Sequence, residues 1–184
     1  MSARFVCRDC NSGWMNDIET AARPFVRKMV MGQALTLDTR EQESVASWLA
    51  LRALGARYTD NPVVPPERDQ LDYFYTHRLP PKACYQWITA YKGGKPFHYQ
   101  GNDIGTVSDI ADPDPPDIPH GILMTLAIGY LAVKLIWMSG AEPTEPDPPN
   151  LLRIWPIGTS AITWPPSRII NDRGLDHLMR MFLD

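Results

Sequence analysis

The sequence has too few cysteines for a disulfide framework and no apolar run long enough to cross a membrane. It holds three cysteines, an odd number, and two of them form one Cys-x-x-Cys pair. Together with the lack of a signal peptide, this count predicts a reducing, cytoplasmic setting. The longest uncharged apolar run, residues 122–133, is shorter than the roughly 20 residues of a spanning helix, so we expect no membrane partner.

The chain also lacks a surplus of basic residues. Its formal net charge is -3, so broad, non-specific attraction to phosphate backbones is not expected. Arg23, Arg27 and Lys28 fall in a stretch of helical period, where they can form a local basic patch or simply a solvated helix face. The sequence contains no Gly-rich phosphate loop, no nucleophile elbow and no dinucleotide fingerprint.

The composition and the order of the patterns indicate one mixed domain. With 44% hydrophobic and 21% charged residues, the chain is typical of soluble globular proteins. Helical periods dominate first, and strand-like alternation follows. We predict a single α+β domain over residues 1–184, with a zinc-knuckle-like segment at 1–15, two main helices within a mainly helical part at 16–80, a mostly antiparallel sheet at 81–170 and a terminal helix at 171–184.

The first predicted helix follows the Cys-x-x-Cys pair. Apolar residues recur at helical spacing up to about residue 30. Asn16 or Asp17 is predicted to cap this helix, and Gly32 to end it. Pro24 is expected to kink the helix or to divide it into two short ones, because proline removes a backbone donor. Residues 35–37 are predicted to form a short strand.

Two more helices are predicted before the sheet. Thr39 and Gln42 have the spacing of a capping box, and the helix that they start runs to about Arg57. A shorter helix starts at residues 65–66, two prolines that the first helical turn tolerates, and ends near Thr76.

Beyond residue 81, strand patterns prevail. Residues 83–91 are rich in aromatic and β-branched side chains and predict a strand, with a turn at 92–95 and residues 96–100 as its hairpin partner. Residues 122–137 fit either two buried strands that bend near Gly129 or one buried helix, and we favour the strands. The other predicted elements are Pro-rich loops at 112–119 and 142–149, a strand at 151–155 and an amphipathic helix at 172–182.

Cys7 and Cys10 bracket two residues, which is the spacing of half a zinc knuckle. Two thiolates on a tight turn supply one edge of the zinc tetrahedron, and two more ligands are required. They can come from Cys84 with a histidine, or from Cys7 and Cys10 of a second copy of the chain. The alternative is that these cysteines are free thiols of a knuckle that has lost its metal.

Residues 6–19, VCRDCNSGWMNDIE, resemble the Cys-x-x-Cys-Asn-x-Gly-Trp-Met segment of bacterial and phage HNH-endonuclease-like proteins. Softer similarities extend the resemblance over most of the chain. They are the helix that contains Trp48, the Pro80–Pro81 step into an aromatic strand, and the phrases RIWP at 153–156 and WPP at 164–166.

The resemblance implies roles for three residues. Cys7 and Cys10 match zinc ligands, and Asn11 matches the last letter of the HNH pattern, near a catalytic divalent metal such as Mg²⁺. In the family, a further Cys-x-x-Cys and the histidine that acts as general base precede this segment. Neither occurs here, so we expect a chain that begins in the middle of its own motif.

The missing histidine has a chemical consequence. Metal-assisted hydrolysis of a phosphodiester needs an activated water, and a positioned base contributes roughly 10²–10⁴-fold. None of the histidines is predicted to lie beside Asn11; they are His77, His98, His120 and His177. Asp17 and Glu19 can join Asn11 as metal ligands, although the helix dipole explains acidic residues there equally well. We therefore expect no nuclease activity from the chain alone.

Trp14 lies directly beyond the cysteine pair and allows two interpretations. It can stack on a base or anchor a partner, or it can pack the knuckle onto a neighbouring helix, which we favour. The tryptophan–proline phrases near the C-terminus likewise predict compact loop packing or a groove for an extended peptide.

Two functional hypotheses follow. The first is an HNH-like, nucleic-acid-associated protein whose nuclease half is absent from this chain. The second is a non-enzymatic protein-binding module, such as a phage or mobile-element protein that inhibits a host defence complex, which the acidic charge and the aromatic residues favour. A homodimer that shares one zinc is a third possibility. The expected partners are nucleic acid, a protein complex that acts on it, or a second copy.

Overall fold

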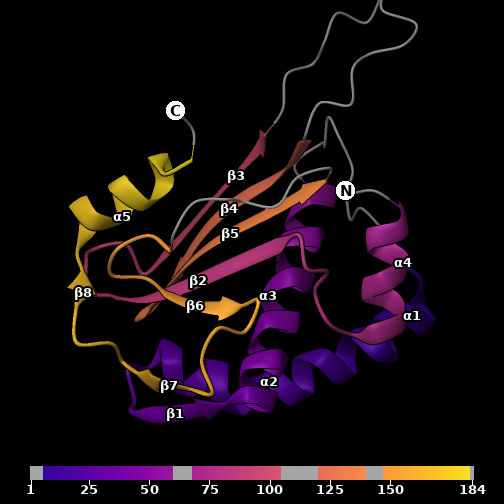
Figure 1. Ribbon diagram of the computed structural model, residues 1–184, viewed down its shortest axis with the longest axis horizontal. Coiled ribbons are helices and arrows are strands. Elements are labelled where there is room, and N and C mark those ends of the chain that lie inside the picture. Colours follow the sequence, from indigo (N-terminus) through magenta and orange to yellow (C-terminus); the bar gives the residue numbers. More distant parts are fainter. Residues whose placement is uncertain (1–5, 60–67, 105–119, 140–146, 183–184) are drawn as a thin grey trace, which may run out of the picture.

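The computed structural model describes residues 6–59, 68–104, 120–139 and 147–182 (Figure 1). In these residues a six-stranded sheet carries helices on both faces, which confirms the predicted α+β class. The loop predicted at 112–119, most of that at 142–149 and the prolines at 65–66 lie outside the described residues. None of the described helices is long and apolar enough to span a membrane.

Helices dominate the N-terminal part, as predicted. Its elements are α1 (Arg8–Ser12), α2 (Trp14–Val30), β1 (Leu35–Asp38), α3 (Thr39–Thr59) and α4 (Arg68–His77). One face of α2 is buried because its apolar residues recur at helical spacing; they are Ile18, Ala22, Val26 and Met29. This face packs against α3, the longest helix among the described residues.

The predicted start of α2 was wrong. The helix begins at Trp14 with Gly13 as its N-cap, whereas Asn16 and Asp17 lie inside its first turn. Pro24 does not divide the helix. It has no backbone N–H to donate to the Thr20 carbonyl, but both residues lie on the exposed side of the helix.

The capping box of α3 is displaced by one residue from its predicted position. The Asp38 backbone N donates to Glu41 Oε2 at 2.8 Å, and the Glu41 N donates to Asp38 Oδ1 at 2.9 Å. Gln42 is fully buried instead, and its Nε2 donates to the Leu37 carbonyl at 3.1 Å. Thr39 and Gln42 have the same spacing as Asp38 and Glu41, so spacing alone did not separate the two boxes.

The sheet contains the strands of the C-terminal part. They are β2 (Cys84–Tyr91), β3 (Phe97–Ile104), β4 (His120–Ile128), β5 (Leu131–Ser139), β6 (Leu152–Trp155) and the short β8 (Ile169–Ile170), in the order β3-β4-β5-β2-β6 with β8 parallel to β2. A separate two-stranded sheet pairs β1 with β7 (Ala161–Trp164). The apolar stretch 122–137 forms the β4–β5 hairpin, with Gly129 at a φ of 53° in the turn, as predicted.

The predicted hairpin between residues 83–91 and 96–100 was wrong. The strand β3 pairs with β4, and β2 pairs with β5 and β6. The reason is burial: β2, β4 and β5 are largely apolar and occupy the middle of the sheet, whereas the more polar β3 takes its edge.

Alternate residues of the central strands face different helices. Ile88 and Val133 belong to the main core beneath α2 and α3, whereas Tyr91 and Ala132 pack beneath α5 (Asp172–Arg180), the predicted terminal helix. The tryptophan of the WPP phrase, Trp164, is fully buried. That of the RIWP phrase donates its indole N–H to the Pro81 carbonyl at 3.1 Å. Both contacts favour the compact packing that was predicted over a peptide groove.

Candidate functional site

The Cys-x-x-Cys pair forms a tight turn at the start of α1. Cys7 is the N-cap of this short helix, and its Sγ accepts a hydrogen bond from the Cys10 backbone N at 3.1 Å. The neighbouring Cys10 thiol and its backbone N–H lower the pKa of Cys7, whereas the Cys7 thiol raises the pKa of Cys10. Cys7 is exposed and Cys10 half-buried. The turn therefore keeps the two cysteines close together at the start of α1.

The described residues supply only half of a zinc site. No group of three or more His, Cys, Asp or Glu side chains gathers within the ranges that the structure covers. Cys84, one predicted source of a third ligand, is fully buried in β2, where its Sγ accepts from the Gln86 amide at 3.3 Å. Burial raises the pKa of Cys84 to about 12, so this thiol does not ionise readily. Burial and this hydrogen bond give no support to its prediction as a zinc ligand, which stays a prediction.

Asn11 lies at a groove between α1 and α3. It is exposed, and its backbone N donates to the Cys7 carbonyl at 3.0 Å. The groove encloses about 960 Å³, and Arg8, Glu19 and Arg52 line it together with Asn11. Glu19 forms an ion pair with Arg52 of α3, each side chain being about 40% exposed. The Glu19 carboxylate, which was considered as a metal ligand, is thus already paired with an arginine.

Asp17, the other acidic candidate, lines a different pocket on the opposite flank of α2. The structure therefore does not bring Asn11, Asp17 and Glu19 together. Residues two apart on a helix face away from each other, so the spacing between 17 and 19 argued against a shared ion from the start.

Trp14 packs onto α4, in agreement with the interpretation that the sequence favoured. Its ring contacts Phe74 and Tyr75 edge-to-face, with centroids 5.9 and 5.6 Å apart, and the Arg78 guanidinium lies 4.6 Å from its centroid. The Trp14 side chain partly offsets the rise in the pKa of Cys10 that is caused by Cys7, and its buried indole N–H has no hydrogen-bond partner among the described residues. Trp14 therefore connects the cysteine turn to α4 rather than presenting a free ring for base stacking.

The three histidines whose side chains are described lie away from the Asn11 groove. His77 ends α4, where its Nδ1 is 3.0 Å from the Tyr73 carbonyl oxygen, and His177 is exposed on α5. His98 is on β3, with a buried Nε2 that has no partner among the described residues. The side chain of the fourth, His120, lies outside the described residues.

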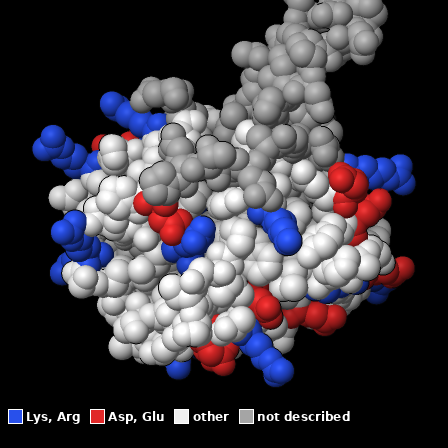
Figure 2. Space-filling model, in the orientation of Figure 1, with Lys and Arg blue, Asp and Glu red and all other residues white. Residues whose placement is uncertain are grey.

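The predicted basic patch on α2 consists of two parts. Arg23, Arg27 and Lys28 are all exposed. Residues four apart share a flank, so Arg23 and Arg27 follow Glu19 along one side, whereas Lys28 points about 100° away from Arg27. Figure 2 shows basic and acidic side chains interspersed on the face it presents.

Comparisons with protein-family models, characterised proteins and solved structures found no match to this chain. The HNH resemblance therefore remains a prediction that rests on residues 6–19 and the softer phrases.

Sequence reasoning did not identify Arg52 as a partner of Glu19 or Arg78 as a partner of Trp14. Each contact joins residues more than 30 positions apart. A long arginine in a helix or at its end is common, so no local pattern marks these two.

Proposed function

We propose that this chain is an HNH-like, nucleic-acid-associated protein that does not cut nucleic acid by itself. The cysteine turn carries the proposal, because it joins two adjacent thiols directly to Asn11 at the edge of a groove lined by Arg8 and Arg52. The support is local to this end of the molecule, where the resemblance to the family is also strongest.

Zinc fits this turn as a half-site. Cys7 and Cys10 would hold two corners of the tetrahedron, and the other two ligands come from another chain, a second copy of this protein being the simplest. A closed structural zinc stabilises the segment that holds it, because the metal fixes a turn that few other contacts support. No step of a reaction passes through this metal in the proposal.

The groove suits a phosphate backbone better than it suits catalysis. Arg8 and Arg52 supply positive charge, which Glu19 reduces in part. Among the described residues that line the groove, the one carboxylate is that of Glu19, and its oxygen is taken up by the ion pair with Arg52. A second divalent metal, such as Mg²⁺ on Asn11, would therefore find no positioned proton acceptor here.

The test is binding of short single- and double-stranded DNA, followed by fluorescence anisotropy. We expect affinity to fall steeply between about 50 and 200 mM salt, and Arg8→Gln to reduce the slope of log K against log salt by about 1. Arg68→Gln, at an exposed site on α4, is the matched control and should leave the slope unchanged. The proposal would be refuted if the affinity for DNA did not change with salt concentration. It would also be refuted if the protein cut DNA in the presence of Mg²⁺ and Asn11→Ala abolished this cleavage.

Metal analysis and light scattering test the zinc. One zinc per two chains in a dimer supports the shared site, and Cys7→Ser should release both the metal and the partner. A monomer without zinc after purification in zinc-containing buffer contradicts it.

A protein-binding module is the second candidate, and one observation favours it. An apolar hollow of about 470 Å³ is lined by Trp14, Leu54, Leu71 and Phe74, beside Tyr75, which is 52% exposed. Aromatic anchors next to an apolar hollow are typical of protein interfaces. Such binding would weaken with Tyr75→Ala and be almost insensitive to salt, which separates it from binding of nucleic acid.

A further inference from the structure

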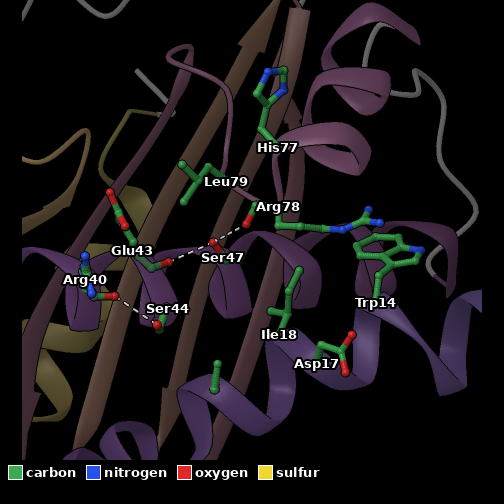
Figure 3. A pocket seen from close by; sticks show the side chains of 11 residues that line it. Trp14, Asp17, Ile18, Arg40, Glu43, Ser44, Ser47, His77, Arg78 and Leu79 are labelled. Atoms are coloured by element: carbon green, nitrogen blue, oxygen red, sulfur yellow. Dashed lines mark hydrogen bonds between the residues drawn. The ribbon is translucent and has the colours of Figure 1, made fainter.

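A second pocket lies on the flank of α2 that faces away from the Asn11 groove (Figure 3). It encloses about 480 Å³ between α2, α3 and the segment that follows α4. This volume is in the range of small-molecule sites. The apolar part of its wall includes Trp14, Ile18 and Leu79. No role assigned above uses this pocket.

Arg78 is held in place at the pocket by its backbone. Its φ of 59° lies in the left-handed region, which non-glycine residues rarely adopt. Its N donates to the Phe74 carbonyl at 2.9 Å, and its carbonyl accepts from the Ser47 Oγ at 2.7 Å. Ser47 is itself buried, at 4% exposure. The chain therefore maintains an unfavourable backbone conformation at a residue that lines the pocket.

The guanidinium is fixed as well. It lies 4.6 Å from the Trp14 ring centroid and 4.5 Å from that of Tyr75, and it donates to the Tyr75 carbonyl. Aromatic faces hold a guanidinium flat and reduce its rotamer freedom without neutralising its charge. Little entropy is then lost when it binds an anion.

Among the described residues, no carboxylate forms an ion pair with Arg78. Within the described part of the chain, neither Arg78 nor Arg40, which also lines the pocket, takes part in an ion pair. Figure 3 shows the two arginines on opposite sides of the pocket, with His77 above them in the view. Arginine is the residue best suited to two-pronged recognition of a carboxylate or phosphate.

Two acidic residues restrict the charge of the ligand. Asp17 and Glu43 also line the pocket, so its formal charge is near zero with His77 neutral. A polyanion such as a nucleoside triphosphate would be repelled by these carboxylates, whereas one negative charge can reach an arginine and leave the acids solvated.

We infer that this pocket binds a small monocarboxylate with a flat apolar body, its carboxylate on Arg78 and its body against Trp14, Ile18 and Leu79. The inference uses neither the cysteine turn nor nucleic acid, so it stands or fails separately from the proposed function.

The test is calorimetric titration of the full chain with 2-naphthoate, its neutral analogue 2-naphthamide, and adenosine triphosphate. 2-Naphthoate should bind more tightly than either of the others. Arg78→Met should weaken its binding by about tenfold to hundredfold, the range for a lost charge-assisted hydrogen-bond pair. Arg68→Met, whose side chain is 94% exposed on α4, is the matched control and should bind as the parent protein does.

Two further measurements make the test decisive if Arg78→Met unfolds. Arg40→Gln leaves the strained backbone intact and should still weaken 2-naphthoate binding several-fold, because it removes half of the unpaired positive charge. The indole N–H resonance of Trp14, assigned with Trp14→Phe, should shift on binding. Equal affinity for the acid and the amide, tighter binding of the triphosphate, or no binding at millimolar ligand would each overturn the inference.

Discussion

Replacing Lys134 by methionine is predicted to stabilise the protein at neutral pH. Lys134 lies in the middle of β5 and is 1% exposed. Its Nζ donates to Thr125 Oγ1 at 3.1 Å and to the Met179 carbonyl at 3.4 Å, and it is not part of any ion pair between described residues. Burial of this amine without a carboxylate lowers its pKa from 10.5 to about 8.

The size of the effect follows from that pKa. Holding the proton in the folded state at pH 7 costs about 3 kcal/mol, since each step of one in pKa corresponds to about 1.4 kcal/mol. Methionine has a similar length and removes this cost. It also leaves the Thr125 hydroxyl and the Met179 carbonyl without a partner, which costs about 1–2 kcal/mol. We expect Lys134→Met to raise the free energy of unfolding by about 1–2 kcal/mol at pH 7.

The gain should disappear as the pH rises. Above about pH 8 the folded state releases the Lys134 proton, whereas the unfolded chain keeps it up to 10.5. The unfolded state then binds more protons, so the stability of the parent protein increases with pH across this window. Lys134→Met has no such proton to lose and lacks this increase.

Urea unfolding, followed by tryptophan fluorescence at several values from about pH 7 to about pH 10, measures the difference. Lys92→Met is the control, because Lys92 is exposed in the turn after β2 and should leave the pH profile unchanged. If the curves of the parent and Lys134→Met stay parallel over this range, or if the variant is the less stable protein at pH 7, the reasoning about a buried, unpaired amine is refuted.

Three further predictions concern the fold. Tyr91→Phe should cost about 1–2 kcal/mol, because the Tyr91 hydroxyl donates to Asp172 Oδ1 at 2.5 Å. This bond, aided by the Gly94 N–H, lowers the pKa of Asp172, so its stabilisation is present above the ordinary pKa near 3.8 and is lost as the pH falls through the folded pKa. The free energy of unfolding of Tyr91→Phe should therefore fall less steeply than that of the parent protein as the pH is lowered. An identical fall in the two proteins would contradict the assignment. Asp38→Ala should cost about 1 kcal/mol in thermal unfolding by removing the cap of α3, whereas Thr39→Ala should have little effect; the reverse order would restore the predicted box. Leu49→Ala, in the fully buried face of α3, should cost about 2–5 kcal/mol in urea unfolding, and a cost below about 1 kcal/mol would mean that the core there is not packed as described.

Local patterns were sufficient for most elements. The helical period predicted α2, and alternation with a glycine at position 129 predicted the β4–β5 hairpin, because both signals arise within a few residues along the chain. The turn of Cys7 and Cys10 was predictable for the same reason. Where two local signals competed, as in the capping boxes at the start of α3, the sequence did not separate them.

By itself, the sequence determined the identity and order of most helices and strands, although not α1, β7 or β8, and the closeness of two thiols, since these depend on neighbours in the chain. The tertiary structure alone decided that β3 pairs with β4, that Cys84 is a core residue and that Glu19 forms an ion pair with Arg52. It also placed the Arg78 guanidinium over Trp14. Such pairings depend on which surfaces bury the most apolar area when the whole chain condenses, and that sum is not contained in any short stretch of residues.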